Sequence, residues 1–218
     1  MVKKAYIGLM FVIVLLVFGT AAFMYNGSTQ TNPGTQPGPE NNSTMPVALT
    51  TGEPVSAMGA LKIADDSPIV RAWKLNQTNP GIESISSEAC DSGVAGMWTI
   101  VYAGNTDKVS VQVNGGKVDL TPLASAHTPD TLNVSGVIDS DRAFSIAAEL
   151  IRQGGYSPTG PASVELYSAP DHRGIWDLMY PVEGSYFIVR LDANNGSVVT
   201  KTLIGSNSGQ NHIIRPGP

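Results

Sequence analysis

The pattern Gly-x-Trp-x-x-x-Tyr occurs twice in this chain of 218 residues, at positions 96–102 and again at positions 174–180. Tryptophan and tyrosine bury large areas, so two such pairs at one spacing restrict where a core can form. The sequence before each pattern also repeats, as "ALKIA" at 60–64 and "AFSIA" at 143–147. Repetition of this kind within a sequence predicts that one supersecondary unit is formed twice.

The start of each copy has the pattern of a helix, more clearly in the second. Apolar residues recur there at helical spacing, namely Ala143, Phe144, Ala147, Ala148 and Ile151. Asp139 or Ser140 is placed to cap the amino terminus of this helix, and a Gly-Gly pair at 154–155 is placed to end it. In the first copy Ser56 can cap a helix, which Pro68 prevents from extending.

Strand-like runs follow each predicted helix. They lie at 82–89, 96–104 and 108–118 in the first copy, and at 163–169, 174–184 and 186–199 in the second. In the last run of each copy apolar residues recur at every second position, which indicates a sheet with one face covered. We therefore predict an α+β fold of two repeated helix-on-antiparallel-sheet units, each ending in a short strand after a glycine turn. A unit of this size has a marginal core alone, so the two are expected to pack together.

Glycines mark the turn before each final strand. Gly196 follows Asp192 and Asn194 in the stretch "LDANNGSVV", and Gly115 and Gly116 occupy the shorter turn of the first copy. Glycine adopts positive φ without a Cβ clash, and Asp and Asn side chains hydrogen-bond turn amides, so these residues are predicted to be structural. A calcium-binding loop is the alternative for Asp192 and Asn194, but the Asp-x-Asp-x-Asp-Gly spacing is missing.

The order of these elements resembles the PepSY domain family. The likeness rests on a helix with alanine pairs, strands that carry Trp or Tyr, and a closing turn with Asp192, Ala193, Gly196 and Val198 in the matching places. The turn "VNGGKV" of the first copy lacks the Asp-Ala pair. The resemblance implies small α+β modules of secreted or membrane-anchored proteins, some of which inhibit secreted metallopeptidases or help them to fold. It implies no catalytic residue set.

Four aromatic residues belong to the repeated pattern: Trp98, Tyr102, Trp176 and Tyr180. They lie on predicted strands that a helix is expected to cover, so we favour a role as anchors of the core or of the helix–sheet interface. The alternative is that they line a groove for a peptide.

An uncharged stretch lies near the amino terminus. Lys3 and Lys4 precede residues 5–25, which carry no charged side chain. A helix of this length spans a hydrocarbon core of roughly 30 Å, and the two lysines favour a cytoplasmic amino terminus. The stretch is longer than the apolar part of a typical signal peptide, which favours a transmembrane anchor over a cleaved signal. Both alternatives place the remaining chain outside the cytoplasm, and the first keeps it at the cell membrane.

Composition divides the rest of the chain. Residues 26–54 are rich in Gly, Pro, Ser, Thr and Asn and are predicted to be a disordered linker. PepSY-like repeats are expected at 55–120 and 138–204, and a disordered tail at 205–218. The connection at 119–137 is long for a loop and is expected to contribute an edge strand.

No catalytic constellation stands out. Asp171 and His172 are adjacent between two predicted strands, but a solvated turn is favoured over an acid–base dyad because no nucleophile or oxyanion site accompanies them. Cys90 is the single cysteine, and His127, His172 and His212 lie in unrelated predicted loops. An internal disulfide is therefore excluded, and a zinc site is not indicated. We expect no enzymatic activity, no cofactor and no metal.

The charge pattern argues against a nucleic-acid partner, because the net charge is −5 and no basic patch is present. Asn-x-Ser/Thr sequons, which suggest glycosylation of an extracytoplasmic chain, occur at Asn26, Asn41, Asn42, Asn76, Asn133 and Asn195.

The function predicted from these features is that of a membrane-anchored extracytoplasmic binding module. An exposed strand edge or sheet face would engage a polypeptide, such as a secreted peptidase or another envelope protein, by strand addition. One alternative is a structural component of the cell surface, of which a pilin-like subunit is one form. A hydrolase that uses Asp171 and His172 is the other alternative.

Overall fold

A computed structural model of the protein describes residues 53–105, 107–124, 131–205 and 211–214. The predicted anchor at 5–25 and nearly all of the predicted linker at 26–54 lie outside these described residues. None of the helices in the described part has the length and apolar character needed to cross a membrane.

The first described helix, α2 (Ala57–Asp66), begins where the sequence predicts. The Ser56 hydroxyl accepts a hydrogen bond from the Gly59 amide (3.2 Å) and so caps the amino terminus. Shortly after the helix ends, Pro68 starts a second helix, α3 (Pro68–Leu75), because proline suits the first position of a helix. The helical pattern of the sequence predicts Pro68 only as a stop, so α3 is not predicted.

The third helix, α4 (Ser140–Gln153), is capped by Asp139, whose carboxylate accepts a hydrogen bond from the Ser140 amide (2.7 Å). It ends at Gly154, after which Gly155 adopts a left-handed φ of 76°. Both ends agree with the prediction. Ala148 differs, since the periodicity places it on the apolar face and the structure leaves it exposed.

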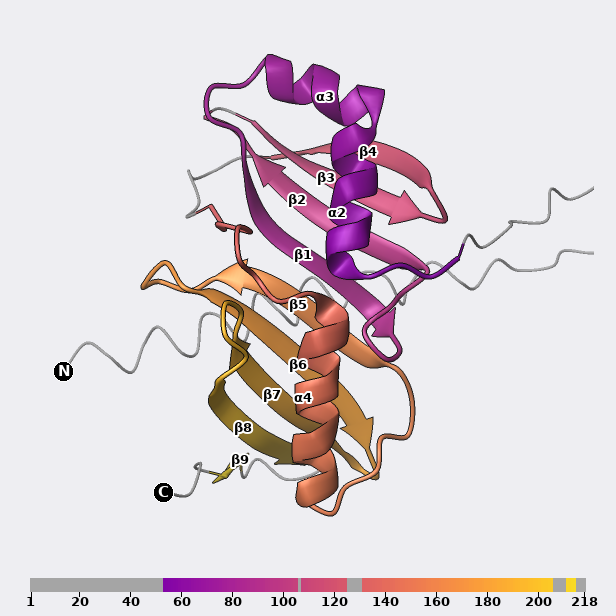
Figure 1. Ribbon diagram of the computed structural model, residues 1–218, viewed down its shortest axis with the longest axis vertical. Helices are drawn as coiled ribbons and strands as arrows, with labels where there is room; N and C mark the ends of the chain where they lie inside the picture. The colour runs from indigo at the N-terminus through magenta and orange to yellow at the C-terminus, as the bar shows by residue number, and fades with distance from the viewer. Residues whose placement is uncertain (1–52, 106, 125–130, 206–210, 215–218) are drawn as a thin grey trace, which may run out of the picture. The chain divides into compact units, whose positions relative to one another are not determined.

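The strands form one antiparallel sheet (Figure 1). They are β1 (Gly81–Cys90), β2 (Met97–Ala103), β3 (Lys108–Asn114), β4 (Lys117–Leu123), β5 (Ala162–Ser168), β6 (Gly174–Val182), β7 (Ser185–Asp192), β8 (Val198–Gly205) and β9 (Asn211–Ile214). Their order in this nine-stranded sheet is β4-β3-β2-β1-β5-β6-β7-β8-β9. We call residues 55–123, with β1 to β4, the first segment, and residues 138–205, with β5 to β8, the second segment.

The predicted fold class, two repeated helix-on-sheet units, is wrong. β1 pairs antiparallel with β5, with Ile85 opposite Leu166, so the strands of both segments form one continuous sheet. Two separate units would each leave the first strand with a row of unpaired amide and carbonyl groups, and these two edges satisfy each other. The described part of the protein is therefore dominated by a single sheet, with short helices packed on it.

The helices cover one face of the sheet (Figure 1). α2 contacts β1, β2 and β3, whereas α4 contacts β6 and β7. Successive side chains of a strand point to opposite faces, so β3 buries Val109, Val111 and Val113 and leaves Ser110 and Gln112 on the other face. The buried residues of both segments belong to one hydrophobic cluster, which means that the two helices share a core.

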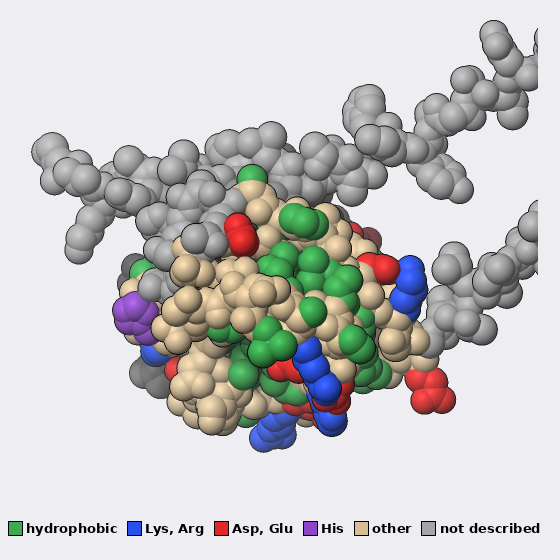
Figure 2. All heavy atoms as spheres, turned by 90° about the horizontal axis from the view of Figure 1, so that it is seen from above, with side chains coloured by type: hydrophobic (Ala, Val, Ile, Leu, Met, Phe, Trp, Pro, Cys, Tyr) green, Lys and Arg blue, Asp and Glu red, His purple; other side chains and the backbone are tan. Residues whose placement is uncertain are grey.

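The outer strands of the sheet are β4 and β9. β4 provides the edge strand expected near 119–137, although it is seven residues long where the prediction has a short strand. β9 pairs with β8, so the prediction of a disordered tail at 205–218 fails for Asn211–Ile214. Figure 2, which views the molecule from above, shows hydrophobic side chains gathered at the end that carries α3 and β4.

Candidate functional site

The amino termini of α2 and α4 meet in the structure. The Ser56 hydroxyl donates a hydrogen bond to Asp139 Oδ2 (2.6 Å), and the Met58 amide donates to Asp139 Oδ1 (3.0 Å). The Ser140 hydroxyl also accepts a hydrogen bond from the Ala57 amide (2.9 Å). α2 therefore receives part of its cap from the second segment, which sequence patterns within one segment do not reveal.

Electrostatics explains why an aspartate lies at this junction. The amino terminus of a helix carries a partial positive charge of roughly half a unit, so two such ends facing each other repel. The Asp139 carboxylate accepts amide hydrogen bonds from both helices and compensates both ends. Gly93 packs against the same junction: its φ is 87°, and a Cβ there would lie 2.2 Å from the Asp141 Cα. Only glycine fits this close approach.

Trp98 and Trp176 tie each helix start to the sheet. Both side chains are fully buried. The Trp98 Nε1–H donates to the Val55 carbonyl (2.8 Å), and the Trp176 Nε1–H donates to the Ile138 carbonyl (3.0 Å). Val55 and Ile138 each precede the cap residue of a helix, so the two indoles do the same work in the two segments. Neither indole lines an open groove.

Tyr102 has a complete set of partners. Its hydroxyl donates to Asp65 Oδ1 (2.6 Å), and the same oxygen accepts a hydrogen bond from Lys74 Nζ (2.7 Å). The Lys74 ammonium also lies 4.4 Å from the centroid of the Tyr102 ring. Burial, with a contribution from Asp65, raises the pKa of Tyr102, so the hydroxyl stays protonated and acts as a donor. Asp65 comes from α2 and Lys74 from α3.

Tyr180 takes the same position in the repeated pattern but lacks these partners. Its side chain is 5 % exposed, and its hydroxyl has no hydrogen-bond partner within the described ranges. Asp65 lies nine residues after the cap of α2, and the corresponding position of α4 is Ala148, which offers no acceptor. Burial raises the pKa of Tyr180 as well, and its ring packs edge-on against Phe144 with centroids 5.5 Å apart.

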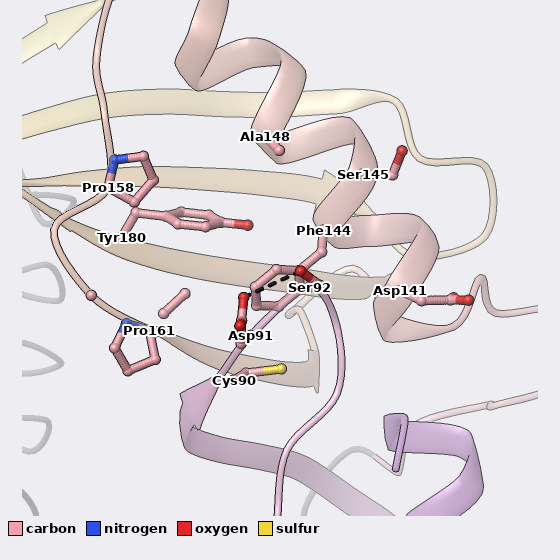
Figure 3. A pocket seen from close by; sticks show the side chains of 12 residues that line it. Cys90, Asp91, Ser92, Asp141, Phe144, Ser145, Ala148, Pro158, Pro161 and Tyr180 are labelled. Atoms are coloured by element: carbon pink, nitrogen blue, oxygen red, sulfur yellow. Dashed lines mark hydrogen bonds between the residues drawn. The ribbon is translucent and has the colours of Figure 1, made fainter. Parts of the chain in front are cut away.

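A pocket of about 330 Å³ lies where Tyr180 is left without a partner. Its walls come from α4, from the end of β1 with the loop that follows, and from residues 158–162. Figure 3 shows the Tyr180 ring extending into the space between Phe144 and Ala148 on one side and the loop at Asp91 on the other. This pocket is the candidate functional site.

The lining of the pocket suits binding better than covalent chemistry. Burial raises the pKa of the Cys90 thiol to about 12, so this group is a weak nucleophile at neutral pH. Asp91 and Asp141 supply the charges, and no lysine or arginine is among the described residues that line the pocket. Tyr180 is a candidate from the repeated sequence pattern, whereas the pocket beside it is not predicted from the sequence. When the two predicted helices are aligned, Ala148 stands at the position of Asp65. This missing carboxylate is the sequence signal that points to the pocket.

The turn residues lie at the ends of two hairpins. Asp192 Oδ1 accepts hydrogen bonds from the amides of Asn194 (3.0 Å) and Asn195 (3.3 Å), and the Gly196 amide donates to the Asp192 carbonyl (2.8 Å). Gly196 has a φ of 74°. Gly115 and Gly116, between β3 and β4, have φ values of 56° and 85°. These residues shape turns that the pocket does not include.

Asp171 and His172 lie in the exposed turn between β5 and β6, away from the pocket lining. Arg173 forms an ion pair with Asp171 (2.7 Å), and this hydrogen-bonded guanidinium lowers the pKa of the Asp171 carboxyl. His172 has a φ of 63°, and its amide donates to the Ala169 carbonyl (2.8 Å), as a tight turn requires.

The uncovered face of the sheet carries charges of both signs. Lys108 pairs with Glu83 (2.8 Å), and Arg190 pairs with Asp177 (2.7 Å). Desolvation raises the pKa of Asp177, and Arg190 opposes that shift. Across 53–214, apart from the gaps in the described ranges, no three His, Cys, Asp or Glu side chains group as metal ligands would.

Three of the six sequons are described, and all three asparagines, Asn76, Asn133 and Asn195, are exposed. Asn26, Asn41 and Asn42 lie outside the described residues. Of the histidines that the sequence places in loops, His127 lies outside the described residues, and His212 belongs to β9.

Comparison with known proteins adds little to this geometry. No family model matches the chain, and no curated protein matches it. A solved structure described as a "putative lipoprotein" from Clostridium difficile 630 is similar, with a TM-score of 0.49 and 13% sequence identity over 68% of this chain and 93% of that one.

Proposed function

We propose that this protein is a membrane-anchored extracytoplasmic binding module that pairs with an extended polypeptide segment along β4. The uncharged stretch at 5–25 after Lys3 and Lys4 supports the anchor and the extracytoplasmic location. The observation that carries the binding role is the position of β4, an outer strand of the sheet that pairs only with β3 among the described strands. An edge strand of this length is a template for strand addition.

The register of β4 indicates which groups face outward. Pro122 has no amide hydrogen, and proline is tolerated in an edge strand where its nitrogen points away from the neighbouring strand. Val118 and Leu120 lie four and two residues before Pro122 in the strand, so their backbone amides and carbonyls also point away from β3. An added strand would form its hydrogen bonds with these two residues.

The surroundings of this edge fit an apolar partner. Val118 and Leu120 are partly buried against the core, and their side chains leave an apolar rim on the helix side of the sheet. Leu123 of β4 and Ile69 and Leu75 of α3 are exposed. Figure 2 shows hydrophobic side chains gathered at the end of the molecule that carries these two elements. The expected ligand is therefore an extended segment with apolar residues at every second position.

The PepSY resemblance implies a secreted peptidase as the partner class. We propose both the family assignment and this class of partner. The order of one helix and several antiparallel strands, closed by a glycine turn, supports the family assignment in the second segment. The absence of a matching family model does not support it.

A peptide-binding experiment tests the role of β4. The full-length chain in detergent micelles is screened against a display library of ten-residue peptides, and hydrogen exchange is measured with the peptides that bind. We expect alternating apolar residues in these peptides and slower exchange at the amides of Val118 and Leu120. Leu120→Pro removes one outward amide and should weaken binding by about tenfold.

Two further variants make this result specific. Leu120→Lys keeps the amide but places a charge among apolar partner side chains, so it should weaken binding as well. Thr121→Val is the matched control, because Thr121 follows the opposite alternation and should bind as the native chain does. Peptides that protect only amides outside β4 would refute the proposal. Self-assembly of the chain that Leu120→Pro abolishes would favour the structural cell-surface alternative.

A further inference from the structure

The pocket beside α4 is separate from the β4 edge, and it differs from the corresponding place in the first segment by two missing groups, the carboxylate of Asp65 and the ammonium of Lys74. In the first segment the ring of Tyr102 has the ammonium of Lys74 over it, 4.4 Å from its centroid. No lysine or arginine is among the described residues around Tyr180, and an open pocket is present instead. The tyrosine at this position of the pattern in the first segment thus lies beside both a carboxylate, Asp65, and an ammonium, Lys74.

The charges of the pocket favour the same kind of group. Asp91 and Asp141 lie on its lining, and no described lysine or arginine there balances them. The Ser92 hydroxyl donates to Asp91 Oδ1 (3.2 Å), which leaves the other carboxylate oxygen of Asp91 available to a ligand. A cation near two carboxylates is attracted, whereas an anion is repelled.

The remaining walls set the shape of the ligand. Phe144, Ala148 and Pro158 contribute apolar surface, and the buried Tyr180 hydroxyl can both donate and accept a hydrogen bond. A volume of about 330 Å³ is at the small end of the range for ligand pockets, and it suits a side chain or a small amine better than a large cofactor.

We propose that this pocket binds an aliphatic primary ammonium group of the kind that a lysine side chain carries. The alkyl stem packs against Phe144 and Ala148. The ammonium donates to the Tyr180 hydroxyl oxygen and is attracted by Asp91 and Asp141. The ammonium of the ligand then lies near a tyrosine and carboxylates, as the ammonium of Lys74 does in the first segment.

Titration by nuclear magnetic resonance tests the proposal on the full-length chain in detergent micelles. The probes are n-butylammonium, n-butanol and butyrate, which share an alkyl stem and differ in charge. We expect butylammonium to shift the resonances of Tyr180, Phe144 and Ala148, with butanol at least fivefold weaker and butyrate without effect. Equal binding of all three probes, or ammonium binding only at other acidic sites, would overturn the proposal.

Variants identify the groups that hold the ammonium. Tyr180→Phe should weaken butylammonium binding by about fivefold and Asp141→Asn by about twofold to fivefold. Tyr102→Phe and Asp119→Asn are the matched controls in the first segment, and neither should change the binding. Tyr180→Phe removes a hydroxyl that has no described partner, so this variant is expected to fold. Undiminished binding by both pocket variants would refute the assignment of the site.

The source of the ammonium is decided by a second pair of probes. A short peptide with one lysine, blocked at both ends, presents the group on a polypeptide, and spermidine presents it on a free amine. Tighter binding of the peptide than of butylammonium identifies a polypeptide as the source, and the reverse order for spermidine identifies a polyamine. Both outcomes require shifts at Tyr180, and their absence with both probes counts against the site itself. The result is independent of the β4 experiment, because the two sets of variants lie in different segments.

Discussion

In both segments of the sheet a helix packs over a buried tyrosine, but among the described residues only the tyrosine of the first segment has a hydrogen-bond partner for its hydroxyl. In the first, the short helix α2 is followed by α3, and together they supply Asp65 and Lys74 to Tyr102. In the second, one longer helix continues past Ala148 and supplies no hydrogen-bond partner to the Tyr180 hydroxyl. The same aromatic pattern therefore occurs with a polar contact in the first segment and without it in the second, and the space beside Tyr180 is a place where a ligand can bind.

The largest changes in the free energy of unfolding are expected at Trp98 and Trp176, which occupy equivalent positions in the two segments. Trp98→Ala and Trp176→Ala should each lower the free energy of unfolding by about 3–5 kcal/mol, because a fully buried indole and its hydrogen bond are lost. Urea unfolding followed by circular dichroism measures both values. A difference above about 2 kcal/mol between the two would show that the segments are not equivalent at this position.

Asp139 and Ser56 should differ, although each caps a helix. Asp139 accepts hydrogen bonds from both segments, so Asp139→Ala should lower the free energy of unfolding by about 2–3 kcal/mol. Ser56→Ala should cost about 1 kcal/mol. The same unfolding measurement decides this comparison. Equal costs would mean that the cap shared between the helices adds no stability beyond an ordinary cap.

The smallest changes in the free energy of unfolding are expected at Tyr102 and Tyr180, and these two changes should differ clearly from each other. Tyr102→Phe removes a hydrogen bond to the partly exposed carboxylate of Asp65 and should lower the free energy of unfolding by about 1 kcal/mol. Tyr180→Phe removes a buried hydroxyl without a described partner and should leave stability unchanged or raise it slightly. Thermal unfolding at neutral pH compares the two variants. A loss at Tyr180 as large as that at Tyr102 would mean that its hydroxyl has a partner in solution.

Features that depend on a few neighbouring residues could be predicted from the sequence. Ser56 and Asp139 cap their helices as expected, since a cap needs only a short polar side chain before an apolar helical pattern. The buried alternation of β3 was also readable. α3 was missed because proline has two local meanings, a stop inside a helix and a favoured first residue of one.

The candidate site was only partly accessible to sequence reasoning. Tyr180 was named from the repeated pattern, but its missing partner depends on where α4 crosses β6 and on the identity of Ala148. Asp91 reaches the same pocket from the loop after β1, about fifty residues earlier in the chain than Asp141. No local pattern links these positions, because they meet only once β1 and β5 pair.

By itself, the sequence determined the local units: where α2 and α4 begin, which strand faces are apolar, and where the glycine turns lie. These follow from backbone sterics, capping and the period of the apolar residues, all of which act over a few residues. The tertiary structure alone decided that β1 pairs with β5, that the two helix starts share Asp139, and that Tyr180 borders a pocket. Those outcomes depend on unpaired strand edges and buried polar groups finding partners far away in the chain.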